Sequence, residues 1–243
     1  MAKNLYTPGQ AEPFSVSRSK IDLYVNCPRC FWMEARYGVK RPGMPGFSLN
    51  NAVDALLKKE FDAHRAAGTA HPYMKEYGID AVPYRHDDMD VWRDSLRRGI
   101  RYHYEPANII ARGGIDDVWV NPAGELIIVD YKATATSAEI TLDGPYKAAY
   151  KRQMEVYQWL FRMNGFSVHP VGYFVFCNGN LDADAFDGQL RFAITLLPYQ
   201  GDAGWVEPTL RAMKVCLDAD ETPTPSEECE HCAYRAAASR FGS

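Results

Sequence analysis

Residues 113–132 read GGIDDVWVNPAGELIIVDYK, a pattern that predicts a β-hairpin. The tetrapeptide Asn121-Pro122-Ala123-Gly124 is typical of a turn and separates the two arms. The run from Leu126 to Val129 is too apolar for a solvated strand, so we expect it to be buried on both faces. Asp130 and Lys132 follow this run and point the same way, because side chains alternate along a strand. A carboxylate and an ammonium in such a place are costly unless they pair or bind a metal.

The other arm of the hairpin carries Asp116 and Asp117, and only one of these neighbours can face the same side as Asp130. Mg²⁺ and Mn²⁺ prefer oxygen ligands, and we expect Asp116, Asp130 and Asp54 to supply them. Asp54 lies in the apolar stripe region of a predicted helix over residues 50–66, which is an unusual place for an acid. The alternatives are a partly exposed helix carboxylate for Asp54 and a surface ion pair, worth little, for the hairpin.

Gln153 and Tyr157 are four residues apart on a predicted helix over residues 145–164, so they share one face. Lys132 should keep its proton, because its free pKa is about 10.4 and nearby carboxylates favour the charged form. It is therefore better suited to stabilise phosphate charge or hold an attacking water than to act as a general base. Gln153 could hold that lysine or water, and Tyr157 could contact a base or the nucleic-acid backbone. An ordinary helix-surface pair is the alternative for these two residues.

The bulk composition fits a globular protein with a packed core. The chain has 243 residues, of which 47% are hydrophobic, and this length suits one domain or a core with small appendages. The net charge of -4 argues against a protein that coats nucleic acid through bulk charge, but it allows a local basic groove. No apolar run approaches the roughly 20 residues that span a bilayer, and residues 1–10 lack a signal-peptide layout. We therefore expect a cytoplasmic protein with no membrane association.

The order of the expected elements predicts an α/β fold with a mixed central β-sheet flanked by helices. Predicted helices cover residues 17–24, 28–37, 50–66, 88–98, 145–164 and 204–218, with a short helix at the end of the chain. Predicted strands cover residues 101–104, the hairpin, 168–177 and 189–196. We expect one domain over residues 1–243, with a mainly helical part at 17–104, the core at 105–200, and a helix with a cysteine motif at 201–243.

Four of the six cysteines form two C-x-x-C pairs near opposite ends of the chain, Cys27 with Cys30 and Cys229 with Cys232. This spacing lets two thiolates face one metal centre, whereas a disulfide network is not expected in a reducing cytosol. Four thiolates suit either structural zinc or an iron–sulfur cluster. In either case the centre would be a clasp that joins the N-terminal helices to the C-terminus.

These residues together resemble the PD-(D/E)XK nuclease superfamily, in particular its RecB-like and CRISPR-associated exonuclease branch. The resemblance spans about residues 17–238, and its combination of motifs is specific although each motif alone is not. The matching motifs are Ser19-Lys20-Ile21-x-x-Tyr24-x-x-Cys27-Pro28-Arg29, Gly113-x-Ile115-Asp116, Asp130-Tyr131-Lys132, Gln153-x-x-x-Tyr157 and Cys229-x-x-Cys232-x-Tyr234.

The resemblance implies a restriction-endonuclease-like core and assigns roles to individual residues. Asp116, Asp130 and the backbone carbonyl of Tyr131 would bind the metal, and Lys132 would be catalytic. Gln153 and Tyr157 would form the helix motif of the active site. The resemblance also favours a [4Fe–4S] cluster at the four cysteines, with structural Zn²⁺ as the alternative that paired C-x-x-C motifs suggest on their own.

Two departures from the family pattern stand out. Asp54 occupies the place where the family usually has a metal-binding histidine, and a carboxylate is an acceptable hard ligand there. Ala238 stands where the last C-terminal cysteine would be, while Cys30 supplies a second N-terminal thiol, so four cysteines remain.

The resulting functional hypothesis is a metal-dependent DNA nuclease, an exonuclease that hydrolyses phosphodiester bonds with metal-activated water. Single-stranded DNA or DNA with free ends is the expected substrate. The chain lacks a G-x-x-x-x-G-K-[ST] motif, so any unwinding would come from a helicase or integrase-type partner. The first alternative is a non-catalytic nucleic-acid-binding or assembly subunit that keeps the nuclease fold. The second is a metal–sulfur structural protein without a nucleic-acid role.

Overall fold

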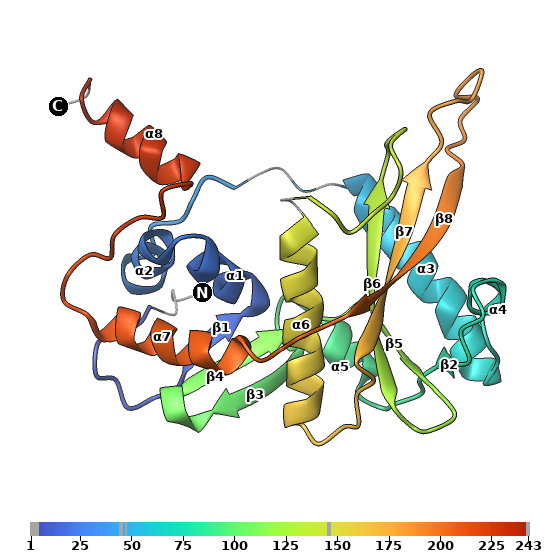
Figure 1. Ribbon diagram of the computed structural model, residues 1–243, viewed down its shortest axis with the longest axis horizontal. Coiled ribbons are helices and arrows are strands. Elements are labelled where there is room, and N and C mark those ends of the chain that lie inside the picture. Colours follow the sequence, from blue (N-terminus) through green and yellow to red (C-terminus); the bar gives the residue numbers. More distant parts are fainter. Residues whose placement is uncertain (1–4, 44–45, 47, 145–146, 242–243) are drawn as a thin grey trace. The chain divides into compact units, whose positions relative to one another are not determined.

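The computed structural model describes residues 5–43, 46, 48–144 and 147–241 (Figure 1). The chain divides into two compact units, each assembled from separate stretches of sequence. We call them the sheet unit, Gly46–Ile100 with Gly113–Ala203, and the cysteine unit, Met1–Pro45 with Arg101–Arg112 and Gly204–Ser243. Among the described residues, no helix is both long enough and apolar enough to cross a membrane.

The sheet unit is built on a five-stranded mixed sheet with the order β2-β5-β6-β7-β8. Strands β6 and β7 are parallel, and the other neighbouring pairs are antiparallel. The strands are β2 Val82–Pro83, β5 Asp117–Val120, β6 Leu126–Thr134, β7 Val171–Gly179 and β8 Phe192–Gln200, and the helices are α3 Ser48–Ala67, α4 Pro72–Glu76, α5 Met89–Arg93 and α6 Ala148–Met163. The predicted α/β fold with a mixed central sheet flanked by helices is confirmed.

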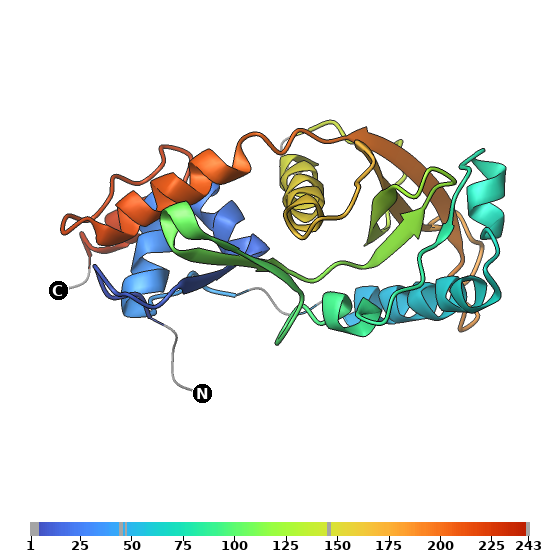
Figure 2. The same ribbon diagram turned by 90° about the horizontal axis from the view of Figure 1, so that it is seen from below.

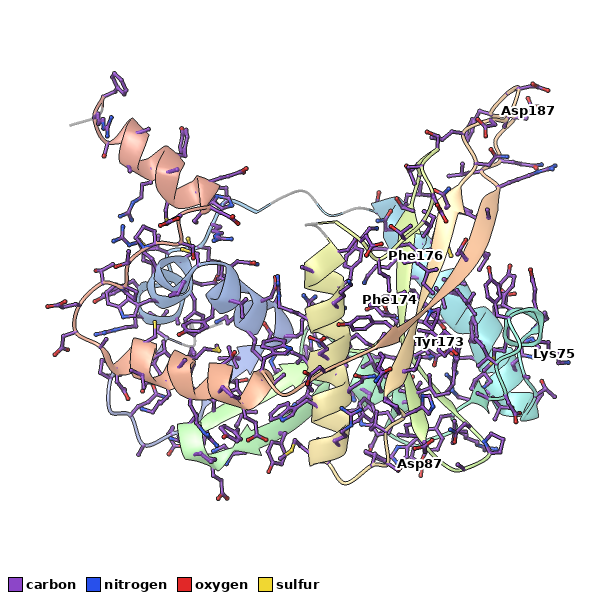
Figure 3. All side chains as sticks on the ribbon, in the orientation of Figure 1. Lys75, Asp87, Tyr173, Phe174, Phe176 and Asp187 are labelled. Atoms are coloured by element: carbon purple, nitrogen blue, oxygen red, sulfur yellow. The ribbon has the colours of Figure 1, made fainter. Side chains whose placement is uncertain are left out.

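The sheet is covered on both faces, by α3 on one side and by α6 on the other (Figure 1). Successive side chains of β6 and β7 point alternately to these two faces. On the α3 face, Tyr131 packs in one cluster with Leu57 and Phe61. On the α6 face, Phe174 and Phe176 approach the ring of Tyr150, with centroid distances of 6.3 and 6.4 Å (Figure 3). Because both faces are covered, the first part of β6, residues 126–129, can be apolar at every position, as its sequence predicts.

The cysteine unit contains a three-stranded sheet and four helices in the described residues. The sheet order is β1-β4-β3, and β1 runs parallel to β4. Helix α7 lies beside the turn between β3 and β4, where the guanidinium of Arg211 sits 5.6 Å from the ring centroid of Tyr104 (Figure 2). The elements are β1 Phe14–Ser17, α1 Arg18–Asn26, α2 Pro28–Tyr37, β3 Ile100–Tyr104, η1 Glu105–Ala107, β4 Ile109–Gly113, α7 Val206–Asp218 and α8 Glu230–Ala238.

Local signals in the sequence predict the first two helices well. Ser17 caps α1 by accepting a hydrogen bond from the Lys20 amide, and Pro28 opens α2, which ends at Gly38 in the left-handed conformation. The predicted helix over residues 88–98 is shorter, because only α5 forms there. The predicted start of the 145–164 helix at Pro145 lies outside the described residues.

The first arm of the hairpin is broken into two strands. Strand β4 ends at Gly113 and β5 begins at Asp117, so the arm predicted over residues 113–120 is strand only in its second half. Gly113 is tightly enclosed, since a Cβ atom there would lie 2.5 Å from Cε1 of Tyr157. Strands β1, β2 and β4 were not predicted. The small size of β2 and the charged or small residues within β4 weaken their strand signal.

Candidate active site and four-cysteine centre

Asp130 is the centre of a polar cluster in the sheet unit. Its side chain is fully buried, and Oδ1 accepts a hydrogen bond of 2.7 Å from Nε2 of Gln153. Oδ2 lies against the ammonium of Lys132, which confirms that Asp130 and Lys132 point the same way from β6. Among the described residues, no group donates a hydrogen bond of regular geometry to Oδ2. A buried carboxylate oxygen with only one ammonium beside it retains lone pairs for a further ligand.

Lys132 is held in place by its surroundings. Its Nζ atom donates to Oε1 of Gln153 at 3.3 Å and lies 4.6 Å from the ring centroid of Tyr150. Burial lowers the pKa of Lys132, but the carboxylates of Asp130 and Asp116 raise it more, so the pKa is raised overall. The lysine is therefore a fixed positive charge at neutral pH and is not a base.

Gln153 and Tyr157 connect the cluster to helix α6. Nε2 of Gln153 also donates to the hydroxyl of Tyr157 at 3.2 Å, so the amide contacts Asp130, Lys132 and Tyr157 together. Tyr157 is 3% exposed and packs against Gly113. The structure thus brings both predicted helix residues to the strand that carries the acid and the lysine.

Asp116 joins the cluster from the segment just before β5. Its Oδ2 atom accepts a hydrogen bond of 2.8 Å from the backbone amide of Tyr131, the residue between Asp130 and Lys132. Burial and the neighbouring charge of Asp130 raise the pKa of Asp116 to about 6. A carboxylate whose pKa is raised by a neighbouring carboxylate is stabilised in its charged form by a bound cation.

Asp54 reaches this cluster through a lysine that the sequence analysis did not assign to it. Nζ of Lys58 lies 2.8 Å from Oδ2 of Asp54 and 3.7 Å from Oδ1 of Asp116. The sequence places Lys58 one helical turn after Asp54, and this spacing could have revealed the pair. The side chain of Lys58 is only 22% exposed, so the ammonium is partly buried beside these two acids.

Asp117 points away from the cluster and is buried in a network of its own. Its carboxylate pairs with Arg65 and Arg93 and accepts a hydrogen bond of 2.8 Å from the hydroxyl of Tyr131. Arg65, for which the sequence analysis predicts no role, is only 8% exposed. The helical spacing of Val53, Leu56, Leu57 and Phe61 predicts one apolar stripe on α3, but Leu56 is 63% exposed.

Replacement of Asp117 by asparagine should destabilise the protein by about 3 kcal/mol, because it leaves two buried guanidinium groups short of a charge partner. The measurement is urea unfolding, with the midpoint compared at unchanged m-value. Asp62 provides the control: it contacts the same two arginines but is 46% exposed, so Asp62→Asn should cost only about 1 kcal/mol. Equal losses in both variants would contradict the assigned network.

The donor set of the Asp130 cluster fits a hard divalent cation. Asp130 provides carboxylate oxygens from β6 and Asp116 from the segment just before β5, and the available lone pairs on Oδ2 of Asp130 face the same cluster. Mg²⁺ and Mn²⁺ accept such a set and complete their coordination with water. Tyr131 lies between Asp130 and Lys132 on β6, and its backbone carbonyl remains the predicted third ligand of the metal.

The four C-x-x-C cysteines converge in the cysteine unit. Their sulfur atoms all lie within 4.8 Å of one another, and none forms a disulfide. Each pair has the same relation to a helix, because Cys27 and Cys229 are N-caps and Cys30 and Cys232 lie in the first turns of α2 and α8. The positive ends of two helices therefore face the four sulfur atoms, which favours thiolates.

Electrostatics around these sulfurs are uneven. Burial raises the pKa of the Cys27 thiol, but hydrogen bonds from backbone amides outweigh it and the pKa falls to about 6. Burial raises the pKa of Cys232 to about 12. Arg41 donates a hydrogen bond of 3.3 Å to Sγ of Cys229 and places a positive charge beside the group. Thiols of such different acidity bind a metal with release of protons.

Comparisons with known proteins identify the family of the chain. The family model described as PD-(D/E)XK nuclease superfamily matches residues 15–237, and the chain belongs to this superfamily. Members of the superfamily are generally nucleases that use divalent metals, which implies a nucleic-acid substrate. No curated protein matches. A solved structure described as "Crystal structure of SSO0001" shares 17% identity with a TM-score of 0.45, covering 91% of this chain and 84% of the other.

Proposed function

We propose that this protein is a divalent-metal-dependent DNA nuclease of the RecB-like, CRISPR-associated exonuclease branch. The observation that carries the proposal is the buried Asp130, held between Lys132 and Gln153 with Asp116 beside it. Such a cluster of opposite charges, centred on a fully buried carboxylate, is suited to bind a cation and a phosphate at one place. The chemistry of this group matches that of the nuclease superfamily to which the chain belongs.

Asp116, Asp130 and the Tyr131 carbonyl would hold the divalent ion. Asp54, the further ligand expected from the sequence, is paired with Lys58 and is left out of this inner set. Bound Mg²⁺ or Mn²⁺ would lower the pKa of a water molecule and offset phosphate charge. The ligand set needs both carboxylates ionised, so binding should weaken as the pH falls below the pKa of Asp116 at about 6.

The other residues of the cluster would orient and stabilise the reacting groups. Lys132 keeps its proton and stabilises the charge that develops on the phosphate, or holds the attacking water. Gln153 fixes both neighbours, because its amide nitrogen donates to Asp130 and its amide oxygen accepts from Lys132. Tyr157 anchors Gln153 from the next turn of α6. Their shared hydrogen bonds keep the site in one geometry before substrate binds.

Two cationic side chains, Lys147 at the N-cap of α6 and Lys132 on β6, are suited to contact the DNA backbone near this cluster. Lys147 lies 5.1 Å from the ring centroid of Tyr150, and Lys132 approaches the same ring. Burial and the neighbouring Lys132 charge lower the pKa of Lys147. Two ammonium groups that destabilise one another would be stabilised by a phosphate between them.

A cleavage assay tests the proposed function. End-labelled linear DNA, single- and double-stranded, and circular DNA of the same sequence are incubated with Mg²⁺, Mn²⁺ or EDTA. We expect loss of linear DNA that requires the divalent ion, with circles left intact because the enzyme acts at free ends. Cleavage that persists in EDTA would contradict the proposal. Cleavage of circular DNA would support the assignment as a nuclease but contradict the assignment as an exonuclease.

A second function is favoured by one observation, the ion pair of Lys58 with Asp54 at the place where a metal ligand is expected. The protein could be a nucleic-acid-binding or assembly subunit that keeps the nuclease fold. DNA binding without turnover, under Mg²⁺ and Mn²⁺ and with a helicase or integrase-type partner supplied, would support this alternative.

For the four cysteines we propose a structural centre with one tetrahedral ion, most simply Zn²⁺. The distances of 3.6 Å from Cys30 to both Cys229 and Cys232, and of 3.9 Å from Cys27 to Cys232, support this choice. A tetrahedral ion with Zn–S bonds of about 2.3 Å requires sulfurs about 3.8 Å apart. The [4Fe–4S] cluster implied by resemblance contains four metal atoms, so its thiolates must spread more widely. Elemental analysis decides, with iron and a brown colour supporting the cluster.

A further inference from the structure

We propose that Lys58 supplies the second cation of the active site, so that the centre takes a single divalent ion. The proposal rests on the proposed nuclease function and specifies how that site stabilises phosphate charge. It starts from the position of the ammonium, 2.8 Å from Asp54 and 3.7 Å from Asp116, on the side of Asp116 that faces helix α3. A lysine in this place is a permanent substitute for an ion bridging the same two acids.

The charge balance of the cluster supports a single ion. Asp54, Asp116 and Asp130 are matched by two ammonium groups, those of Lys58 and Lys132. The net charge of these five side chains is therefore slightly negative, and one divalent ion makes it slightly positive. A slightly positive site suits an anionic phosphodiester. A second divalent ion normally sits about 3.5–4 Å from the first, and here it would meet the Lys58 charge at close range and be repelled.

The surroundings of Lys58 keep its ammonium in place. The preceding residue of α3, Leu57, is buried in the core against the sheet, so this helix is fixed on its sheet-facing side. Asp54 lies one turn earlier on the same helix and binds the ammonium directly. On this proposal Asp54 is a positioning residue that orients Lys58, which explains why an acid stands there without contacting Asp130. Lys59, the next residue, is exposed and offers a matched control.

Manganese binding measured by electron paramagnetic resonance tests the proposal without relying on activity. The protein is titrated with Mn²⁺ as wild type, Lys58→Gln and Lys59→Gln. We expect a single Mn²⁺ at the active site of the wild type and of Lys59→Gln. Lys58→Gln should bind a second Mn²⁺ close enough to the first to give a spin-coupled signal. The protein is used with its cysteine centre loaded, so that the sites do not mix.

Cleavage assays on the same proteins provide the second readout. Lys58→Gln should lose about 10²-fold in rate at low Mn²⁺, as expected for removal of one charge-stabilising group, and should recover part of it at high Mn²⁺ with a steeper metal dependence. Lys59→Gln should behave as wild type in both respects. Should the glutamine variant fail to fold, Lys58→Met repeats the test with the aliphatic stem retained.

The outcomes separate this proposal from the proposed function. Two Mn²⁺ ions in the wild-type centre, or an unchanged stoichiometry in both Lys58 variants, would overturn the role of Lys58 even if DNA is cleaved. A change in stoichiometry in a protein that cleaves no DNA would support Lys58 as the second cation and overturn the nuclease assignment instead.

Discussion

Replacement of Asp130 by asparagine is expected to reduce the proposed DNA cleavage by about 10³-fold or more, because it removes the central carboxylate of the proposed metal site. The amide keeps the shape of the side chain and can still accept the hydrogen bond from Gln153 through Oδ1. Oδ2, the oxygen that lies against Lys132 without a regular hydrogen-bond donor, becomes a nitrogen that cannot bind a cation. The loss should therefore appear in chemistry and metal binding while the fold is retained.

The measurement is single-turnover cleavage of end-labelled DNA at saturating enzyme, over a range of Mg²⁺ and Mn²⁺ concentrations. Excess metal should rescue the variant only in small part, because the ligand is lost and not merely weakened. Thermal unfolding should show that the variant still folds, with some loss of stability, because Lys132 loses its charge partner while the repulsion between Asp130 and Asp116 is relieved. These two readouts together separate a site defect from a folding defect.

Asp184→Asn is the matched control for this experiment. Asp184 is exposed in the connection between β7 and β8, within the same unit, and has no part in the cluster. Its replacement should leave the cleavage rate within about twofold, as expected of a surface substitution. If Asp130→Asn also retained a rate within tenfold of the wild type, Asp130 would not be a metal ligand of this reaction.

The hairpin shows why much of this site could be predicted from the sequence. The apolar run of residues 126–129 requires two covered faces, and alternation then places Asp130 and Lys132 on the same one. The spacing of Gln153 and Tyr157 requires only that their helix cover that face. Each of these inferences depends on a local period, of two for a strand and 3.6 for a helix, which no tertiary contact alters.

Residues whose roles depend on a partner from elsewhere in the chain could not be predicted in this way. Lys58 and Arg65 both have ordinary sequence surroundings on an amphipathic helix. Their side chains point toward the protein interior because they pair with Asp116 and Asp117, two neighbouring acids whose side chains point in opposite directions. Nothing local in a sequence shows which lysine of a charged helix meets a carboxylate more than 50 residues away. Strand β1 was missed for a similar reason, since its pairing with β4 joins distant segments.

Loss of one thiol from the four-cysteine centre is expected to have the second large effect. Cys30→Ser, or removal of the metal with a strong chelator, should lower the melting temperature of the cysteine unit by more than about 10 °C. Structural zinc contributes on the order of 10 kcal/mol in small domains, and each kcal/mol corresponds to about 2–4 °C in a chain of this size. The link also joins residues 199 positions apart, such as Cys30 and Cys229, and so constrains a long stretch of chain.

Helix α8 should respond most strongly, because it has no buried residue of its own. Its first turn carries Cys232 and its N-cap is Cys229, so among the described residues the four-cysteine group, with the metal proposed for it, is its principal attachment, supplemented by a contact of Arg235 with Met33. A helix of nine residues without buried side chains is not stable by itself in water. Backbone amides of Glu230–Ala238 should therefore be protected from hydrogen exchange in the metal-loaded protein and lose that protection in Cys30→Ser.

Cys216→Ser separates loss of the centre from loss of any thiol. Cys216 lies in α7 of the same unit, is partly buried, and takes no part in the four-cysteine group. Its replacement should cost about 1 kcal/mol, as is typical of a single substitution, and leave the exchange of α8 unchanged. Equal effects of the two serine variants, or protection of α8 that survives complete metal removal, would show that packing and not the metal holds this helix. Since the structure shows no apolar face on α8 that is buried, we expect the metal to be decisive.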